Sequence, residues 1–314
     1  GQQITNWGDG TEDMMISHTY LEPGIYTIVT KNIQTFGQGT TLPDSVCLPI
    51  IRLRHLNKSL KKGRHLCRNW KNLLKVDISN HHFDSIDGMF NNCQQLTSVD
   101  LSSCTVNENI TDTSYLVAWC YKMKNVKMFS NFANCTKITN MTHMFAYTSL
   151  TYSPISVIPD SCENIAKIFF ETEVTDLSGL TIGSGVTTFD DWKPAGLTVM
   201  NNAIIRNSVI KFTGDTLITS MLNLQRPNST DWTSYFEGCI SLTHDIDFPS
   251  NTTNVTNCFK GCIGLTHATS NWDDSYGNII PTGCYSGCTE ITHIDGVNIG
   301  KSAYVNGLDD IPPA

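Results

Sequence analysis

The sequence predicts an α/β repeat solenoid with a parallel β-sheet face, preceded by a small β-rich cap. Three observations predict it: a repeated phrase, a cysteine at a fixed place in that phrase, and a short apolar strand pattern. The phrases FEGCISLTH, FKGCIGLTH and YSGCTEITH begin at Phe236, Phe259 and Tyr285, with their aromatic residues 23 and 26 residues apart. This period is typical of repeat proteins, in which each unit buries its apolar edge only by stacking on the next.

Five of the twelve cysteines recur at one position of the repeat, three residues after an aromatic residue and three before Leu or Ile. A position shared by successive repeats faces inward, so we expect a column of buried, reduced thiols rather than a metal site. The predicted column comprises Cys93, Cys135, Cys239, Cys262 and Cys288. Cys258 and Cys284 share a second position. Because adjacent coils lie about 5 Å apart, a disulfide between these two residues is sterically open.

The first 40 residues differ from the rest. Ile4–Trp7 and Ile25–Val29 are strand candidates, separated by Asp-Gly and Pro-Gly turns. The string WGDGT…HTYLEPGIYTI resembles the PKD-type β-sandwich signature over about 25 residues. The strands that such a domain carries before its Trp have no counterpart here. The resemblance therefore implies a truncated PKD-like unit, residues 1–40, that caps the first coil.

Residues 41–75 are expected to form a basic connector or N-terminal cap of the repeats. From Val46 to Val76 there are nine Lys or Arg and no Asp or Glu, so subtracting +9 from the net charge of −8 leaves −17 on the rest of the chain. Leucines and a tryptophan follow at roughly helical spacing. This stretch could dock a polyanion or an acidic partner, or form a solvated helix or loop. The candidate docking residues are Arg52, Arg54, Lys58, Lys61, Lys62 and Arg64.

Residues 76–314 are predicted to form the repeat body, with a degenerate region from about 155 to 225. The segments MFNNCQQLTSVDLSSC, NCTKITNMTHMF and CFKGCIGLTH resemble the BspA-type leucine-rich repeats. Leu96-x-x-Val99-x-Leu101 fits the L-x-x-L-x-L strand frame of that family. The resemblance implies a cell-surface adhesin of bacteria or protists, and a Trp-Gly-Asp-Gly unit ahead of such repeats is similar to an arrangement in phage tail and virion proteins.

Histidine and threonine also recur in register. His244, His267 and His293 each follow a threonine, at Thr243, Thr266 and Thr292, at outward positions of the expected strands. One hypothesis is a ligand-binding or pH-responsive strip, because stacked imidazoles repel one another when protonated near pH ~6.5. The alternative is a solvated ladder that fills repeat positions.

The sequence contains no recognised catalytic motif, so we expect no enzyme activity, no cofactor and no metal site. We also expect no nucleic-acid partner and no membrane insertion. No secretion or anchor signal is visible, and many cysteines suit assembly in a reducing cytoplasm. These points favour a virion-surface component of a phage, such as a tail fibre or receptor-binding protein, whose partners are other virion proteins or a host-cell protein or glycan. The alternative is a bacterial cell-surface adhesin.

Overall fold

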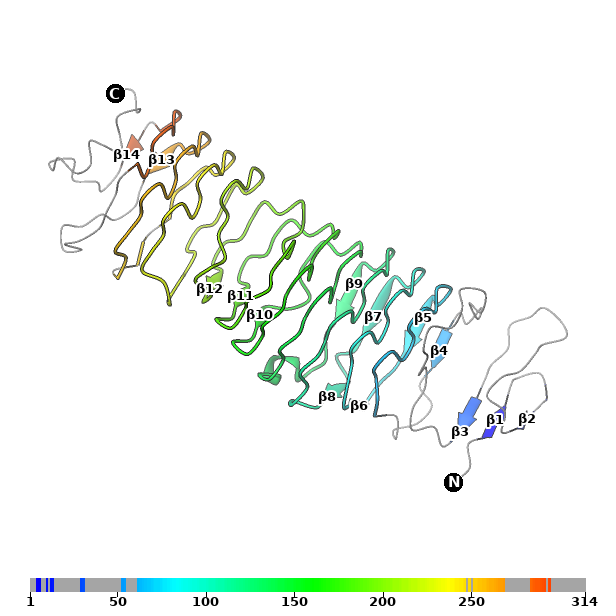
Figure 1. Ribbon diagram of the computed structural model, residues 1–314. Coiled ribbons are helices and arrows are strands. Elements are labelled where there is room, and N and C mark those ends of the chain that lie inside the picture. Colours follow the sequence, from blue (N-terminus) through cyan, green and yellow to red (C-terminus); the bar gives the residue numbers. More distant parts are fainter. Residues whose placement is uncertain are drawn as a thin grey trace. The chain divides into compact units, whose positions relative to one another are not determined.

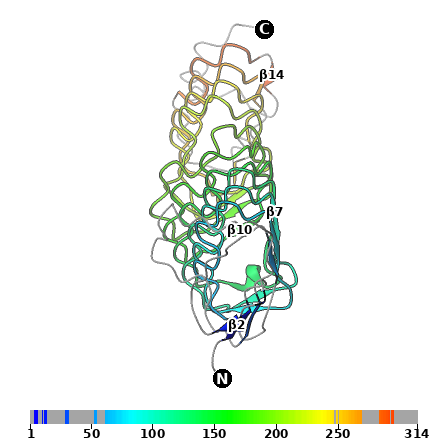
Figure 2. The ribbon, with the colours of Figure 1, turned by 90° about the vertical axis from the view of Figure 1, so that its right-hand side faces the viewer.

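The computed structural model describes residues 4–6, 10, 12–13, 29–31, 52–54, 61–246, 248–249, 251–268, 283–291 and 293–294. The chain divides into two compact units. Unit 1 comprises residues 1–150 and 165–171, and unit 2 comprises residues 151–164 and 172–314. Within each unit the chain winds through successive coils, which Figure 1 shows in sequence order and Figure 2 shows after a quarter turn.

Unit 1 begins with an antiparallel sheet and continues with parallel pairs. The first sheet has the order β2-β1-β3, and the later pairs β4–β5, β6–β8 and β7–β9 are all parallel (Figure 1). Its elements are β1 (Ile4–Asn6), β2 (Glu12–Asp13), β3 (Val29–Lys31), β4 (Arg52–Arg54), β5 (Lys75–Asp77), β6 (His82–Phe83), β7 (Ser98–Asp100), β8 (Thr105–Val106), β9 (Asn125–Lys127) and the 3-10 turn η2 (Phe132–Asn134).

Unit 2 contains only parallel strands among its described residues. Strands β10, β11 and β12 form one sheet in sequence order, and β13 pairs with β14. Isolated parallel bridges such as Val199–Ser220 continue the pairing between these strands. The bounds are β10 (Val157–Ile158), β11 (Thr181–Ile182), β12 (Ile204–Ile205), β13 (His267–Ala268) and β14 (His293–Ile294). The region from 155 to 225, degenerate in sequence, is therefore regular in structure.

Backbone hydrogen bonds explain why the coils turn without forming α-helix. The N–H groups of Phe90 and Asn92 donate to carbonyls of the next coil, Leu116 at 2.8 Å and Ala118 at 2.7 Å. The N–H of Cys93, the next residue along the chain, instead donates to the Phe90 carbonyl of its own turn at 3.2 Å. An α-helix requires each N–H to reach the carbonyl four residues back. Because alternate N–H groups are used between coils, the described residues contain no α-helix, and the α/β class predicted from the sequence is wrong in this respect.

The repeated aromatic residues form buried stacks in unit 2. The rings of Phe236 and Phe259 lie 5.2 Å apart and 5° from parallel, and those of Phe259 and Tyr285 lie 5.5 Å apart and 6° from parallel. The cysteine three residues after each aromatic residue donates its S–H to an aromatic residue's carbonyl in the preceding coil. Cys262 reaches Phe236 and Cys288 reaches Phe259, both at 3.0 Å. Cys239 does the same toward Phe212 at 3.1 Å.

In unit 1 the cysteine column contains Cys93 and Cys120 but not Cys135. The Cys93 thiol donates to the Cys67 carbonyl and the Cys120 thiol to the Phe90 carbonyl, both at 3.0 Å. Cys135 instead follows η2, and its sulfur lies 3.9 Å from a carbonyl of its own turn. The prediction misplaced Cys135 because Phe132-x-x-Cys135 imitates the repeated phrase, whereas a valine replaces the aromatic residue before Cys120.

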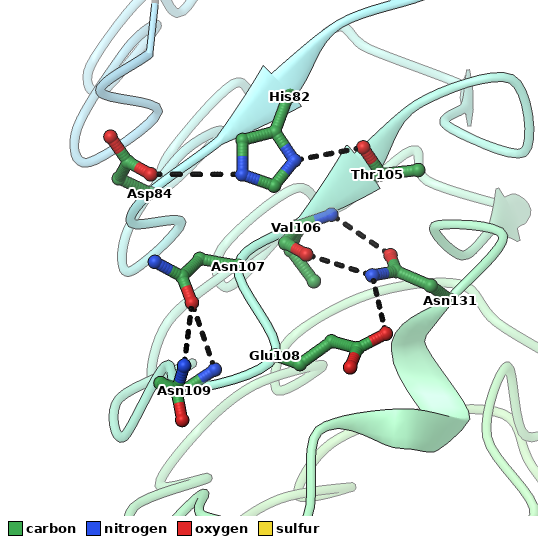
Figure 3. A network of polar contacts seen from close by, with 8 residues as sticks. All are labelled: His82, Asp84, Thr105, Val106, Asn107, Glu108, Asn109 and Asn131. Atoms are coloured by element: carbon green, nitrogen blue, oxygen red, sulfur yellow. Dashed lines mark hydrogen bonds and ion pairs between the residues drawn. The ribbon is translucent and has the colours of Figure 1, made fainter.

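A side chain takes the place of a strand where η2 begins. The Asn131 amide accepts from the Val106 N–H at 2.9 Å and donates to the Val106 carbonyl at 2.8 Å (Figure 3). It therefore makes both bonds that a neighbouring strand would make with β8. On β6 and β8, the His82 Nδ1 lies 2.9 Å from the Thr105 hydroxyl (Figure 3). The coil is thus closed without a strand, and the chain turns directly into η2.

The N-terminal predictions have mixed outcomes. A strand does form at Ile4–Asn6, in the antiparallel β2-β1-β3 sheet. Of the motif residues that carry the PKD resemblance, the structure describes Gly10, and the others lie outside the described residues. The predicted connector already contains repeat structure, because β4 pairs in parallel with β5 in the register Arg52–Lys75. The part of the chain that the structure describes contains no helix of the length and apolar character that a bilayer crossing requires.

The buried cysteine column predicts unreactive thiols. Burial raises the pKa of Cys239 to about 12 and that of Cys288 to about 11, so almost no thiolate is present at pH 8. In a Cys47→Ser variant, which removes the one cysteine outside the described residues, iodoacetamide should modify the folded chain very slowly and all remaining thiols after denaturation. Mass spectrometry measures both states. Rapid labelling of Cys239 or Cys288 in the folded chain would contradict the buried column.

The exposed pair on β7 and β9 predicts a small loss of stability in acid. Hydrogen bonds from Lys127 and Ser102 lower the pKa of Asp100 to about 2. The stabilisation from a lowered carboxylate pKa is present above the unfolded value of about 4 and is lost as the pH falls through the folded value. Because Asp100 is half exposed, Asp100→Asn should reduce the free energy of unfolding by less than about 1 kcal/mol at pH 6. Denaturant titrations should show this difference disappearing near pH 2, and a constant difference would argue against the pair.

Candidate recognition surface

The structure brings the predicted histidines into one column of unit 2. His244 bridges His267 in parallel register, and His267 lies opposite His293 between β13 and β14. The rings of His244 and His267 stack 5.7 Å apart and 10° from parallel. Thr292 and the side chain of His293 lie outside the described residues.

The threonines beside these histidines form a ladder along the coils. The Thr243 hydroxyl donates to the Thr219 carbonyl at 3.0 Å, and the Thr266 hydroxyl donates to the Thr243 carbonyl at 3.2 Å. Each hydroxyl also lies 2.9 Å from Nδ1 of the histidine that follows it. Because the hydroxyl hydrogens are used on carbonyls, the histidine Nδ1 atoms carry the protons in these contacts. The threonine ladder comprises Thr175, Thr198, Thr219, Thr243 and Thr266.

The hydrogen bonds of the threonine ladder mainly connect neighbouring coils to one another. Each carbonyl of the ladder accepts both the backbone N–H and the hydroxyl of the next threonine, as at Thr198, where the distances from Thr219 are 2.8 and 3.1 Å. Hydroxyls that are already committed offer no hydrogen for an external ligand. The threonine ladder therefore stabilises the stacking of the coils and does not supply hydrogen-bond donors to a ligand.

The predicted basic residues are not gathered into one described patch. Lys61 and Lys62 are exposed, but the exposed Arg64 forms an ion pair with Asp87 at 2.9 Å. Burial raises the pKa of Asp87, and Arg64 opposes that rise. Arg52 and Arg54 lie on β4 with undescribed side chains, and Lys58 is outside the described residues.

A row of stacked rings in unit 1 was not found from the sequence. We call it the aromatic strip, and its members are Tyr115, Trp119, His143, Tyr147 and Phe170, all partly exposed. Trp119 stacks on Tyr115 at 5.6 Å, on His143 at 5.7 Å and on Tyr147 at 5.4 Å. Phe170 meets Tyr147 edge-on at 5.5 Å. Partly exposed Tyr, Trp and His side chains of this kind combine apolar area with polar atoms, which suits recognition.

The backbone beneath the aromatic strip is in an unfavourable conformation. Tyr115, Trp119, His143 and Tyr147 have φ angles of 57°, 58°, 53° and 57°, in the left-handed region. A bulky residue there is an outlier that costs on the order of 1–3 kcal/mol, and such strain concentrates at functional sites. Four bulky residues of one partly exposed patch therefore share a backbone conformation that costs free energy.

Several equivalent positions in other coils hold glycine or asparagine, which suit this backbone. Hydrogen bonds between coils align Gly88 with Tyr115 and Asn92 with Trp119, and both have positive φ, 59° and 61°. In unit 2 the position of Trp119 corresponds to the repeated glycine of the phrase, as in Gly238, where φ is 78°. Glycine and asparagine tolerate this region with little strain. The following coil carries Lys167 and Glu171 at the positions of His143 and Tyr147, also with positive φ, 57° and 52°. What distinguishes the aromatic residues is therefore their stacking on this left-handed backbone.

This correspondence between Trp119 and the repeated glycine is the sequence signal from which the aromatic strip could have been predicted. The repeated phrase places glycine two residues after its aromatic residue, and the same position holds Trp119 and Tyr147 in the related stretches LVAWC and MFAYT. An aromatic residue at the position of a repeated glycine indicates a functional site only where the backbone is known to require glycine. The sequence alone does not show that the backbone at this position has a positive φ.

The aromatic strip has a neutral histidine and a neighbouring cation. Burial and then Lys167 lower the pKa of His143, which keeps its imidazole neutral at pH 7 and suited to stacking. The Nδ1 atom of His143 is buried without a hydrogen-bond partner. The Lys167 ammonium lies 4.9 Å above the Phe170 ring. Within the described residues, no three His, Cys, Asp or Glu side chains converge to hold a metal ion.

Comparisons with known proteins give one family match. The model of the BspA type leucine rich repeat region matches residues 63–224 and 219–306. Among curated proteins, nothing matches.

Solved structures give further matches to repeat proteins. A leucine-rich repeat protein from Bacteroides ovatus is 20% identical with a TM-score of 0.44, and the match covers 78% of this chain and 60% of that one. A leucine rich cell surface protein from Faecalibacterium prausnitzii is 18% identical with a TM-score of 0.29, covering 81% of this chain and 75% of that one. The chain thus spans about three fifths of the length of the Bacteroides ovatus protein.

The left-handed corner predicts an unusual order of stability for two truncations of Trp119. Both Trp119→Ala and Trp119→Gly remove the ring and its stacking, but only glycine accepts a φ of 58° without strain. We therefore expect the glycine variant to be more stable than the alanine variant by about 1 kcal/mol, against the usual preference for alanine. Chemical denaturation of both variants measures the difference. A more stable alanine variant would mean that the corner is not left-handed.

Proposed function

The chain belongs to the BspA-type leucine-rich repeat family, and on that basis we propose that it is a bacterial cell-surface recognition protein without catalytic activity. In this proposal the repeats form a solenoid that presents the aromatic strip to a partner. The family match over residues 63–306 supports the repeat architecture. A role in a phage virion and a PKD-like cap, both predicted from the sequence, find no support in the comparisons, so the surface-protein alternative is preferred.

The observation that carries the proposal is the strained aromatic strip. Bulky rings stand where the repeat backbone favours glycine or asparagine, and they remain partly exposed. A fold selected for stability alone would lose this strain through substitutions at these positions. Interfaces concentrate their binding energy in Trp and Tyr anchors of this kind.

The way the rings pack favours a protein partner over a glycan. A sugar ring binds an aromatic side chain by laying its apolar face on an open ring face. In the aromatic strip Trp119 stacks against three neighbouring rings, which leaves less of its face open to a sugar. Edges, hydroxyls and the indole N–H suit the mixed apolar and polar surface of a protein.

Binding to cells tests this function. The purified chain, coupled to fluorescent beads, is offered to intact epithelial cells and to bacterial cells, with and without prior trypsin or periodate treatment. We expect trypsin, which removes surface proteins, to abolish binding, and periodate, which oxidises glycans, to leave it. A Trp119→Gly, Tyr147→Gly double variant should bind at least about 10-fold more weakly, because two interface anchors are lost.

Two further variants test which surface of the chain binds the partner. Leu217 is an exposed apolar residue of unit 2, 48% accessible, so Leu217→Ala controls for general loss of apolar surface and should bind normally. A His244→Ala, His267→Ala variant tests the histidine column. Normal binding by the double glycine variant, together with loss in the histidine variant, would move the site from the aromatic strip to the histidine column.

A further inference from the structure

Unit 2 contains an arginine enclosed by aromatic rings. Arg226 is only 1% exposed, and its guanidinium carbon lies 4.1 Å from the ring centre of Tyr235 and 4.7 Å from that of Trp232. Both rings are fully buried. Phe248 makes an edge contact with Trp232, with the ring centres 5.3 Å apart. The charge of Arg226 is therefore sealed inside the repeat core.

The known partners of this guanidinium are all neutral. One terminal nitrogen donates to the Asp231 carbonyl at 2.9 Å and the other to the Ser208 carbonyl at 3.1 Å. The Asp231 carboxylate accepts instead from the N–H and hydroxyl of Thr233, at 2.8 and 2.6 Å. No carboxylate of the described residues forms an ion pair with Arg226, and an arginine side chain stays protonated in proteins.

Three polar atoms of the same cluster are buried without a hydrogen-bond partner. They are the Nε of Arg226, the Nε1 of Trp232 and the hydroxyl of Tyr235. The Arg226 Nε and the Trp232 Nε1 can only donate a hydrogen bond, and the Tyr235 hydroxyl can donate or accept one. Each unsatisfied buried donor costs about 1–3 kcal/mol, and an uncompensated buried charge costs more. A cluster with surplus donors and a net positive charge calls for an acceptor that carries negative charge.

We propose that this cluster binds a small monovalent anion of the halide type, with Arg226 as counter-charge and the donors of Trp232 and Tyr235 completing its shell. An anion accepts every donor and neutralises the guanidinium, whereas a water molecule satisfies donors but leaves the charge uncompensated. The anion fastens adjacent coils of unit 2 and is independent of the aromatic strip.

Thermal unfolding in different salts tests the site. Chloride or bromide at 100 mM should raise the Tm by about 2–4 °C over sodium methanesulfonate of equal ionic strength, with saturation as the concentration rises. Crystals soaked in bromide should show an anomalous peak beside Arg226. Both readouts use the intact chain and need no binding partner.

Conservative variants connect the effect to the named atoms. Trp232→Phe and Tyr235→Phe remove one donor each and keep the aromatic packing, so both should fold and lose most of the halide-specific rise. Arg226→Met should lose all of it. Arg206→Met is the matched control, because Arg206 is an exposed cation paired with Asp160, and it should keep the full rise. An equal halide effect in all four variants, or an ordered water without a bromide peak in the cluster, would overturn the proposal.

Discussion

The structure depends on backbone hydrogen bonds that no coil can make alone. At each corner, alternate N–H groups donate to the next coil while those between them close the coil's own turn, as at Phe90 and Cys93. This division holds successive coils at the spacing of parallel strands. It also prevents helix, because half of the donors that a helix needs are already used. The stability of each repeat therefore lies largely in its neighbours.

Register follows from this constraint, and the side-chain columns follow from register. Phe259 stacks between Phe236 and Tyr285 because coil bonds place the three anchors directly above one another. A cysteine thiol then finds a carbonyl of the preceding coil at hydrogen-bond distance, as Cys262 does. The threonine ladder repeats the arrangement on another side of the coil with a hydroxyl in place of a thiol. Small donors at fixed positions thus satisfy carbonyls that the strands leave only partly bonded.

The same regularity makes departures from it informative. The two positions that hold Ser234 and Gly238 in unit 2 hold Tyr115 and Trp119 in one coil of unit 1 and aromatic residues again in the next, on an equally left-handed backbone. Stacking of these rings stabilises the fold by about 0.5–1.5 kcal/mol for each pair, which offsets part of the cost of the left-handed backbone. A partner that meets their edges would supply the reason for keeping them. Strain without such a use would be removed by ordinary substitution.

The sequence by itself determined the repeat, its period, the parallel pairing of His244, His267 and His293, and the buried cysteine column of unit 2. These follow from the spacing of identical phrases, since equal spacing brings equal residues to the same side of the coil. It did not determine that Cys120 rather than Cys135 enters the column, that the corner is left-handed, or that Arg226 is enclosed by rings. Only the tertiary structure decided these features, because they depend on which carbonyl of a neighbouring coil each N–H reaches. That choice sets the handedness of each corner and the direction in which its side chains point.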